Sequence, residues 1–251
     1  MIHFVGAGSG AVDLITIRGA KLLSSADVII YAGSLVNPQL IDVYAKNDCI
    51  VYDSSKLHLE EVINIMIDSE KNSLNTVRLH TGDPSIYGAI REQMDRLKKL
   101  NISYDVCPGV SSFCGMASSL KCEYTLPNVS QTVIITRMEG KTPVPDKEKI
   151  SKLAQHNSTM IIFLSTGLLK ELSVELINGG YSPNTPAVIV YKATWQDEKI
   201  CYCTIDSLYQ TAKDNNIYKT ALIGVGNFLG DNYELSKLYD KHFSTEFRNG
   251  E

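Results

Sequence analysis

The sequence predicts an α/β protein of two domains, with a parallel sheet in the first half and a mixed sheet in the second. Up to Leu120, five short apolar runs alternate with five segments of helical periodicity, which is typical of a parallel sheet covered on both faces. Beyond that point the alternation ends, and two apolar runs flank a short polar turn, as in an antiparallel hairpin. We therefore expect two domains, 1–120 and 121–251.

Composition narrows the class of protein before any motif is considered. The 251 residues include 24 basic and 28 acidic side chains, and the net charge of −4 argues against general nucleic-acid binding. No apolar run approaches the ~20 residues of a membrane span, and residues 1–5 begin a strand rather than a signal peptide. The six cysteines include no CxxC pair, so we expect reduced thiols, no metal site and a cytoplasmic protein.

The first half opens with a strand at residues 2–5, a glycine-rich turn from Gly6 to Gly10, and a helical rhythm. This turn resembles a dinucleotide fingerprint, but its spacing is GxGxG, and the second strand, 27–31, lacks the acidic residue that would hold a ribose. The pattern therefore disfavours a nicotinamide cofactor and leaves a turn whose backbone N–H groups face a ligand. Further elements are expected as helices at 37–44 and 58–70 and strands at 49–52, 76–80 and 103–106.

The stretch around which the first half is organised runs from Thr81 to Gly88, and we call it the central turn. An apolar strand leads into it, and a periodic run from Ile86 leads out. Asp83 stands where a helix N-cap belongs and Pro84 where a first helical residue belongs, so the pattern predicts a strand-to-helix turn. Open α/β sheets bind ligands at such turns, where Gly82 would allow close approach and Asp83 would accept hydrogen bonds. The plain alternative is that Asp83 only caps a helix.

A second strand-to-helix turn follows residues 103–106, and Ser111 and Ser112 place hydroxyls at its helix start. An irregular, proline-containing loop is expected at 139–145. The second half is otherwise predicted to contain strands at 132–137, 160–164, 187–191, 199–204 and 221–225, helices at 146–155, 168–177 and 208–213, and a final helix with a frayed tail at 233–251.

These stretches together resemble the tetrapyrrole methylase family, and within it the branch that methylates C11 of precorrin-4 or cobalt-precorrin-4. Three stretches are more particular to that branch: Tyr31–Val36, the Thr-Arg-Met-Glu-Gly loop, and Tyr191–Trp195. Ser9 and Ala11 depart from residues common in the family's first turn, and Gln196 replaces a proline that often follows the tryptophan. The full set of matching stretches is 5–10, 13–16, 31–36, 81–88, 108–112, 131–145 and 191–195.

The resemblance implies two α/β domains with a cleft between them, in which S-adenosylmethionine is bound in a folded conformation. Several of the implied contact residues are small or apolar, which suits recognition mainly by backbone groups. For Leu164 and Ala221, plain core packing is the alternative interpretation. The cofactor contacts carried over by position are Ser9, Gly82, Asp83, Ser111, Ser112, Leu164, Ala193 and Ala221.

The chemistry that the resemblance implies is methyl transfer from a sulfonium to a nucleophilic carbon of a reduced macrocycle. Such a reaction needs alignment and exclusion of water rather than a nucleophilic side chain, and the sequence identifies no catalytic residue. The tetrapyrrole substrate carries many acidic side arms, so local positive charge is expected around it. The candidate substrate-binding residues are Arg91, Arg137, Lys141 and Lys192, although each could equally be a surface charge.

Other functions stay open on the sequence alone. Relatives within the family methylate other precorrin positions, a modified histidine of a translation factor, or ribosomal RNA, and the acidic charge disfavours the last two. A nicotinamide-dependent oxidoreductase and a non-catalytic nucleotide-binding regulator are the alternatives from other classes. The sequence also leaves open whether the substrate carries cobalt. The resemblance, together with apolar stretches such as Cys201–Cys203, predicts a homodimer.

Overall fold

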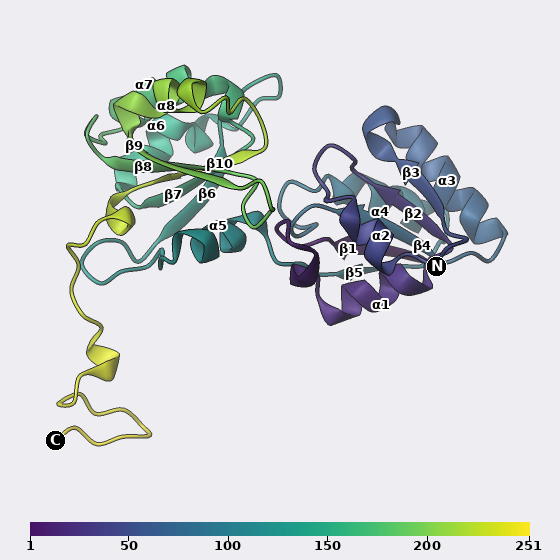
Figure 1. Ribbon diagram of the computed structural model, residues 1–251, viewed down its shortest axis with the longest axis horizontal. Helices are drawn as coiled ribbons and strands as arrows, with labels where there is room; N and C mark the ends of the chain where they lie inside the picture. Colours follow the sequence, from purple (N-terminus) through teal and green to yellow (C-terminus); the bar gives the residue numbers. More distant parts are fainter. The chain divides into compact units, whose positions relative to one another are not determined.

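The computed structural model describes residues 1–251, which form two compact units. Unit 1 contains Met1–Met116 and Lys192–Asp197, and unit 2 contains Ala117–Tyr191 and Glu198–Glu251. Each unit holds one five-stranded sheet, which confirms the predicted α/β class (Figure 1). The sequence suggests a boundary at residue 120, whereas the contacts change beside Met116 and assign the 192–197 segment to unit 1.

The sheet of unit 1 has the strand order β3-β2-β4-β1-β5, and every pairing is parallel, as predicted. Its carboxyl ends therefore lie along one edge, with β4 and β1 adjacent at the centre. The strands are β1 (Ile2–Gly6), β2 (Val28–Tyr31), β3 (Ile50–Asp53), β4 (Thr76–His80) and β5 (Tyr104–Cys107). The helices are α1 (Ile17–Ser25), α2 (Gln39–Tyr44), α3 (Leu59–Lys71), α4 (Ile90–Lys99) and α5 (Ser112–Leu120), which crosses from unit 1 into unit 2.

The two faces of this sheet bury different sets of side chains, because successive residues of a strand point to opposite faces. Val77 and Leu79 of β4 belong to the core that includes Leu23 of α1 and Leu40 of α2. The core on the other face includes Phe4 and Ile30 from the strands, with further side chains from α3 and α4. Thr76, Arg78 and His80 of β4 alternate with Val77 and Leu79. These three polar side chains therefore point to the same face as Phe4 and Ile30.

The sheet of unit 2 has the order β6-β7-β10-β8-β9 and is mixed, as predicted. Only β6 and β7 pair in parallel, and the predicted hairpin is confirmed by antiparallel pairing of β8 with β9. The helices α6, α7 and α8 cover one face (Figure 1). The elements are β6 (Val133–Arg137), α6 (Ile150–Leu153), β7 (Thr159–Phe163), α7 (Leu169–Asn178), β8 (Pro186–Tyr191), β9 (Lys199–Thr204), α8 (Leu208–Asp214) and β10 (Ala221–Val225).

Two predicted helices of unit 2 differ from the structure. The segment 146–155 has only one α-helical turn, α6, between two 3-10 turns. The predicted C-terminal helix at 233–251 is wrong, since its only helical element is the 3-10 turn Lys237–Tyr239. Leu235 and Phe247 of this segment are 82% and 91% exposed, so no packed apolar face stabilises a helix that would be marginal by itself. None of the helices in either unit combines the length and apolar character needed to cross a membrane.

Candidate functional site

Three glycine-containing turns meet at the carboxyl edge of the unit 1 sheet, after β1, β4 and β5. Gly82 N donates to the Gly8 carbonyl at 2.8 Å, and Gly8 N donates to the Gly82 carbonyl at 3.3 Å. A Cβ on Gly6 would lie 2.6 Å from both the Gly82 carbonyl oxygen and Gly109 Cα. A side chain at Gly6 would therefore force the three turns apart.

Asp83 joins two of these turns instead of capping a helix. Its Oδ2 accepts from Gly109 N at 2.8 Å, and its Oδ1 accepts from Ser85 N at 2.9 Å and from the Ser85 hydroxyl. Partial burial would raise the pKa of Asp83, but the hydrogen bonds from Ser85 and Gly109 outweigh it and lower that pKa. The predicted N-cap is therefore wrong: α4 begins only at Ile90, after a cap residue, Ala89, in the left-handed conformation.

The segment after β8, Lys192–Asp197, packs against the first glycine turn within unit 1. Thr194 Oγ1 accepts from Ala11 N at 3.0 Å and shares a hydrogen bond with Ser9 Oγ at 2.9 Å. The indole of Trp195 lies against Gly10, where an added Cβ would be 2.0 Å from its Cδ1 atom. The turn from Gly6 to Gly10 is therefore held by hydrogen bonds to a segment about 185 residues further along the chain.

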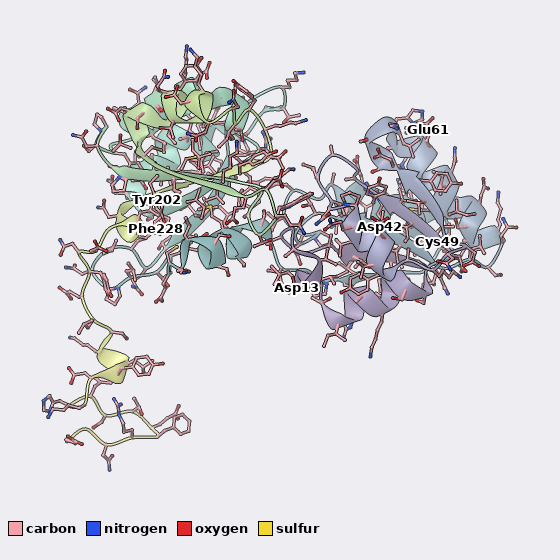
Figure 2. The ribbon with its side chains drawn as sticks, viewed as in Figure 1. Asp13, Asp42, Cys49, Glu61, Tyr202 and Phe228 are labelled. Atoms are coloured by element: carbon pink, nitrogen blue, oxygen red, sulfur yellow. The ribbon has the colours of Figure 1, made fainter.

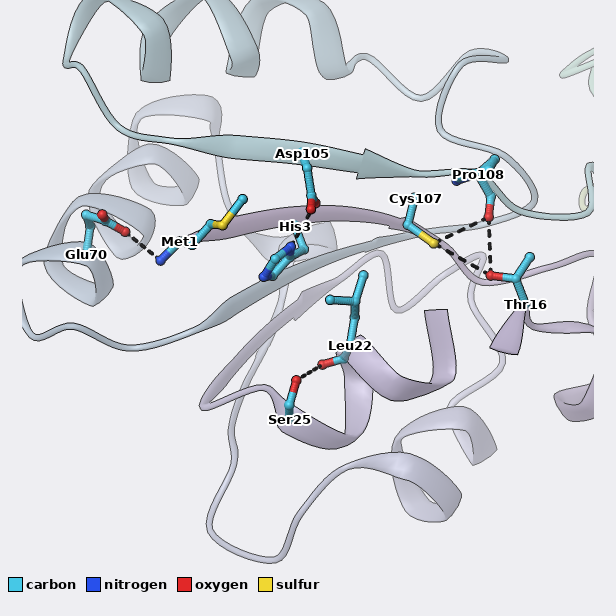
Figure 3. A network of polar contacts seen from close by, with 9 residues as sticks. All are labelled: Met1, His3, Thr16, Leu22, Ser25, Glu70, Asp105, Cys107 and Pro108. Carbon is cyan, nitrogen blue, oxygen red and sulfur yellow. Dashed lines mark hydrogen bonds and ion pairs between the residues drawn. The ribbon is translucent and has the colours of Figure 1, made fainter. Parts of the chain in front are cut away.

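Two further residues support these turns. Thr16, the N-cap of α1, lies 3.5 Å from the Pro108 carbonyl and 3.6 Å from Cys107 Sγ through its hydroxyl, so the helix start is tied to the end of β5 (Figure 3). Asn37 Nδ2 donates to the Gly10 carbonyl at 2.9 Å, while its Oδ1 accepts from Gln39 N. The sequence analysis placed Asn37 only at the start of a predicted helix, 37–44, and missed Thr194 as a support, although Thr194 lies in the 191–195 stretch that resembles the family.

Most of the predicted cofactor residues are brought together in unit 1. Gly82 has φ of +61°, and a Cβ there would lie 3.3 Å from Ser112 N and 3.5 Å from Ser111 Cα. Ser9, Ser111 and Ala193 are buried beside it or in the adjoining turns. The members of this group are Ser9, Gly82, Asp83, Ser111, Ser112 and Ala193.

The other two predicted cofactor residues, Leu164 and Ala221, lie in unit 2. Leu164 directly follows the end of β7, and Ala221 is the first residue of β10, which pairs with β7 in antiparallel orientation. Ala221 is buried, and its carbonyl accepts from Thr166 Oγ1 at 3.2 Å. Leu164 is 63% exposed with φ of +52°, so core packing does not describe it. An exposed leucine in a strained conformation at a strand end is instead typical of a binding surface.

The predicted substrate cations have different surroundings. Arg137 donates to the carbonyls of Met138 and Thr142 at 3.1 and 3.2 Å, and to that of Pro143 at 2.8 Å. Its guanidinium therefore folds the loop that follows β6. Lys141 of the same loop is exposed and forms no ion pair.

In unit 1, the two remaining cations have carboxylate partners. Arg91 is 84% exposed in its side chain and pairs with Asp95 one helical turn later, at 3.0 Å. Lys192 Nζ lies 2.6 Å from Asp197 Oδ2 and 4.8 Å from the centre of the Trp195 ring. Arg91 thus has the surroundings of a surface charge, whereas Lys192 is held beside the glycine turn by the indole.

Burial weakens several of the thiols as nucleophiles. All six cysteines are free, and burial raises the pKa of Cys203 to about 11 and also raises the pKa values of Cys114 and Cys122. A thiolate is the reactive form, so these side chains are weakly nucleophilic at neutral pH. No group of three or more His, Cys, Asp or Glu side chains could hold a metal ion.

Comparison with known proteins agrees with the architecture. The sequence model of the tetrapyrrole (corrin/porphyrin) methylases matches residues 1–209. A cobalt-precorrin-4 C(11)-methyltransferase from Methanocaldococcus jannaschii is 52% identical over 248 residues, covering 98% of this chain and 95% of the relative. A precorrin-4 C(11)-methyltransferase from Pseudomonas aeruginosa is 36% identical over 251 residues, covering 100% of this chain and 99% of the relative.

A solved structure extends the likeness to three dimensions. The X-ray structure of cobalt precorrin-4 methyltransferase, a cobalamin biosynthetic enzyme, is similar with a TM-score of 0.89 at 45% identity. The match covers 92% of this chain and 96% of that one. Sequence and fold therefore agree that this chain belongs to the tetrapyrrole methylase family.

Proposed function

We propose that this chain is an S-adenosylmethionine-dependent methyltransferase that acts on C11 of cobalt-precorrin-4 in cobalamin biosynthesis. The observation that carries the proposal is the 52% identity, over nearly the full length of both chains, to a relative named for that activity. Identity falls to 36% with the relative named for precorrin-4 without cobalt, which favours the cobalt-containing substrate. Methylation at another tetrapyrrole position and nicotinamide-dependent oxidation are less well supported.

The turns of unit 1 have two features that suit the proposed cofactor: open space at Gly82 and small polar side chains around it. At Gly82, the missing side chain leaves space beside Ser112 N that a Cβ would fill. The turns around it carry small hydroxyl side chains, Ser9 and Ser111. When bound, S-adenosylmethionine would supply a methyl group already activated by its sulfonium. Gly82, Asp83 and their neighbours then need only hold and orient it and exclude water.

In this proposal, positively charged side chains recognise the substrate, and no side chain acts as a catalytic nucleophile. Lys141 carries a charge that no neighbour neutralises, and Arg137 folds the loop that presents it. Lys192 contributes a second charge from its place against the Trp195 ring. Carboxylate side arms of a tetrapyrrole would be attracted to such groups. Both Lys192 and Arg91 have a carboxylate partner, Asp197 and Asp95 respectively. Arg91 is the weakest of the four candidates, because its side chain is 84% exposed on α4, whereas Lys192 also lies against the Trp195 ring.

The proposal includes a cytoplasmic homodimer. The edge strand β9 exposes Tyr202 to 61% and Ile200 to 36%. Tyr202 is labelled in Figure 2. A second copy of the chain would cover both side chains. A symmetric contact between identical patches is the commonest way to do so. Sedimentation at micromolar concentration is expected to give the mass of two chains, and the mass of one chain would contradict the dimer.

The test of the activity is methyl transfer from labelled S-adenosylmethionine to cobalt-precorrin-4 and to precorrin-4, assayed side by side. We expect transfer to both with a higher kcat/KM for cobalt-precorrin-4, and the label at C11 in the product. A label at another carbon would support a different member of the family. If the protein binds NAD in calorimetry but not S-adenosylhomocysteine, the oxidoreductase alternative would replace the proposal.

A further inference from the structure

We infer that Arg78 and Gln93 are positioning residues that hold the central turn in the conformation required for cofactor binding. This inference rests on the proposed function, because it assumes that the central turn faces the cofactor. It is carried by a buried chain of polar contacts that runs from strand β4 to the residue preceding helix α4.

The chain of contacts begins at Arg78, three residues before the central turn. Arg78 Nη1 donates to the carbonyl of Ile30 on β2 at 3.2 Å, and its Nε donates to Gln93 Oε1 at 3.4 Å. Gln93 Nε2 in turn donates to the carbonyl of Ala89 at 3.1 Å. Arg78 and Gln93 are only 8% and 5% exposed, so water does not compete strongly for these bonds.

The exit of the central turn needs such a support. Tyr87 and Ala89 have φ values of +56° and +49°, a conformation that residues with side chains rarely adopt. Gly88 between them lies so close to Pro84 that a Cβ would be 2.1 Å from the Pro84 carbonyl oxygen. Gln93 holds the carbonyl of Ala89, so it fixes the point at which this strained turn enters α4.

The charge of Arg78 determines which way the Gln93 amide faces. A guanidinium can only donate hydrogen bonds, so the amide oxygen of Gln93 must face Arg78 and its NH₂ group must face Ala89. Arg78 has no carboxylate partner, and burial lowers its pKa to about 10, which still leaves it protonated at neutral pH. A buried cation of this kind is costly if it serves packing alone. We assign to the buried Arg78 charge the role of orienting the Gln93 amide.

Three variants of the full chain separate positioning from a general structural role. Gln93→Glu keeps an acceptor for Arg78 and adds an opposite charge, but it removes the donor to Ala89. Gln93→Met keeps a similar length and removes both contacts. Glu92→Gln changes the exposed neighbouring residue and serves as the matched control. Each variant is measured by calorimetric titration with S-adenosylhomocysteine, by thermal unfolding, and by hydrogen exchange of residues 85–90.

We expect Gln93→Glu to unfold at or above the parent temperature while its Kd for S-adenosylhomocysteine rises about three- to tenfold, the scale of one lost hydrogen bond. Exchange should accelerate in residues 85–90 and not in the rest of unit 1. Gln93→Met should lose both stability and affinity, and Glu92→Gln should lose neither. If Gln93→Glu does not fold, Arg78→Lys, which cannot span both acceptors, is expected to show the same local exchange and loss of affinity.

Two outcomes overturn the inference and are distinct from failure of the proposed function. Unchanged affinity in folded Gln93→Glu would show that the central turn does not depend on Gln93. A loss of affinity that only follows a loss of stability would show a structural role. If the parent chain itself does not bind S-adenosylhomocysteine, the proposed function fails first, and the inference fails with it.

Discussion

Acid destabilisation of unit 1 should depend on one histidine, His80, which ends β4 immediately before the central turn. His80 is 5% exposed, and its Nε2 has no hydrogen-bond partner. Its ring centre lies 6.1 Å from that of Phe4, and Arg78 is two residues earlier on the same strand. Burial, with a further contribution from the Arg78 charge, lowers the pKa of His80 from 6.5 to about 3.

The sign of the effect follows from proton binding. Between pH 3 and 6.5 the unfolded chain carries a proton on this imidazole and the folded chain does not, so stability rises with pH across that window. At about 1.4 kcal/mol per pH unit, lowering the pH from 7 to 5 should remove about 2 kcal/mol of unfolding free energy. Carboxylates with lowered pKa, such as Asp53 and Asp83, lose their contribution only near and below their ordinary pKa of 3.8.

The assay is urea unfolding of the parent and of His80→Leu at pH 7, 6 and 5. Leucine removes the titrating group without leaving a polar atom unpaired at the position of Nε2. The parent should lose about 2 kcal/mol more than the variant between pH 7 and 5. Parallel pH dependence of the two proteins would refute the buried, neutral state of His80.

Three further substitutions test the site. Gly82→Val should abolish binding of S-adenosylhomocysteine with a near-parental circular dichroism spectrum, because the branched side chain strains a φ of +61° and fills the space beside Ser112; unchanged affinity would place the cofactor elsewhere. Arg137→Ala should leave that affinity within about twofold but weaken tetrapyrrole binding by roughly tenfold to a hundredfold, because the loop that presents the Lys141 charge loses the carbonyl contacts that fold it; the parent, which still presents that charge, should be more sensitive to salt, and loss of the cofactor instead would contradict the assignment. Thr194→Val removes the acceptor of Ala11 N and should cost about 1–3 kcal/mol in urea unfolding, so an unchanged midpoint would show that the hydroxyl is dispensable.

The sequence by itself was sufficient to predict those strands and helices in which the spacing of apolar residues indicates the buried face. The five parallel strands of unit 1, the mixed sheet of unit 2 and the β8–β9 hairpin follow from local periodicity and turn residues. The glycine turns after β1 and β4 could also be recognised, because glycine marks positions where backbones approach closely. The family resemblance then pointed to the residues that meet in unit 1.

Only the tertiary structure decided which partners the polar side chains of the site take. Asp83 has the local pattern of a helix cap, yet Gly109 N, 26 residues later, takes one of its oxygens. Thr194 completes the glycine turn from 185 residues beyond Ser9. Arg78 is buried in a central strand because Gln93 and the Ile30 carbonyl accept its hydrogen bonds. Such pairings depend on where distant segments meet in space, and local periodicity carries no information about that.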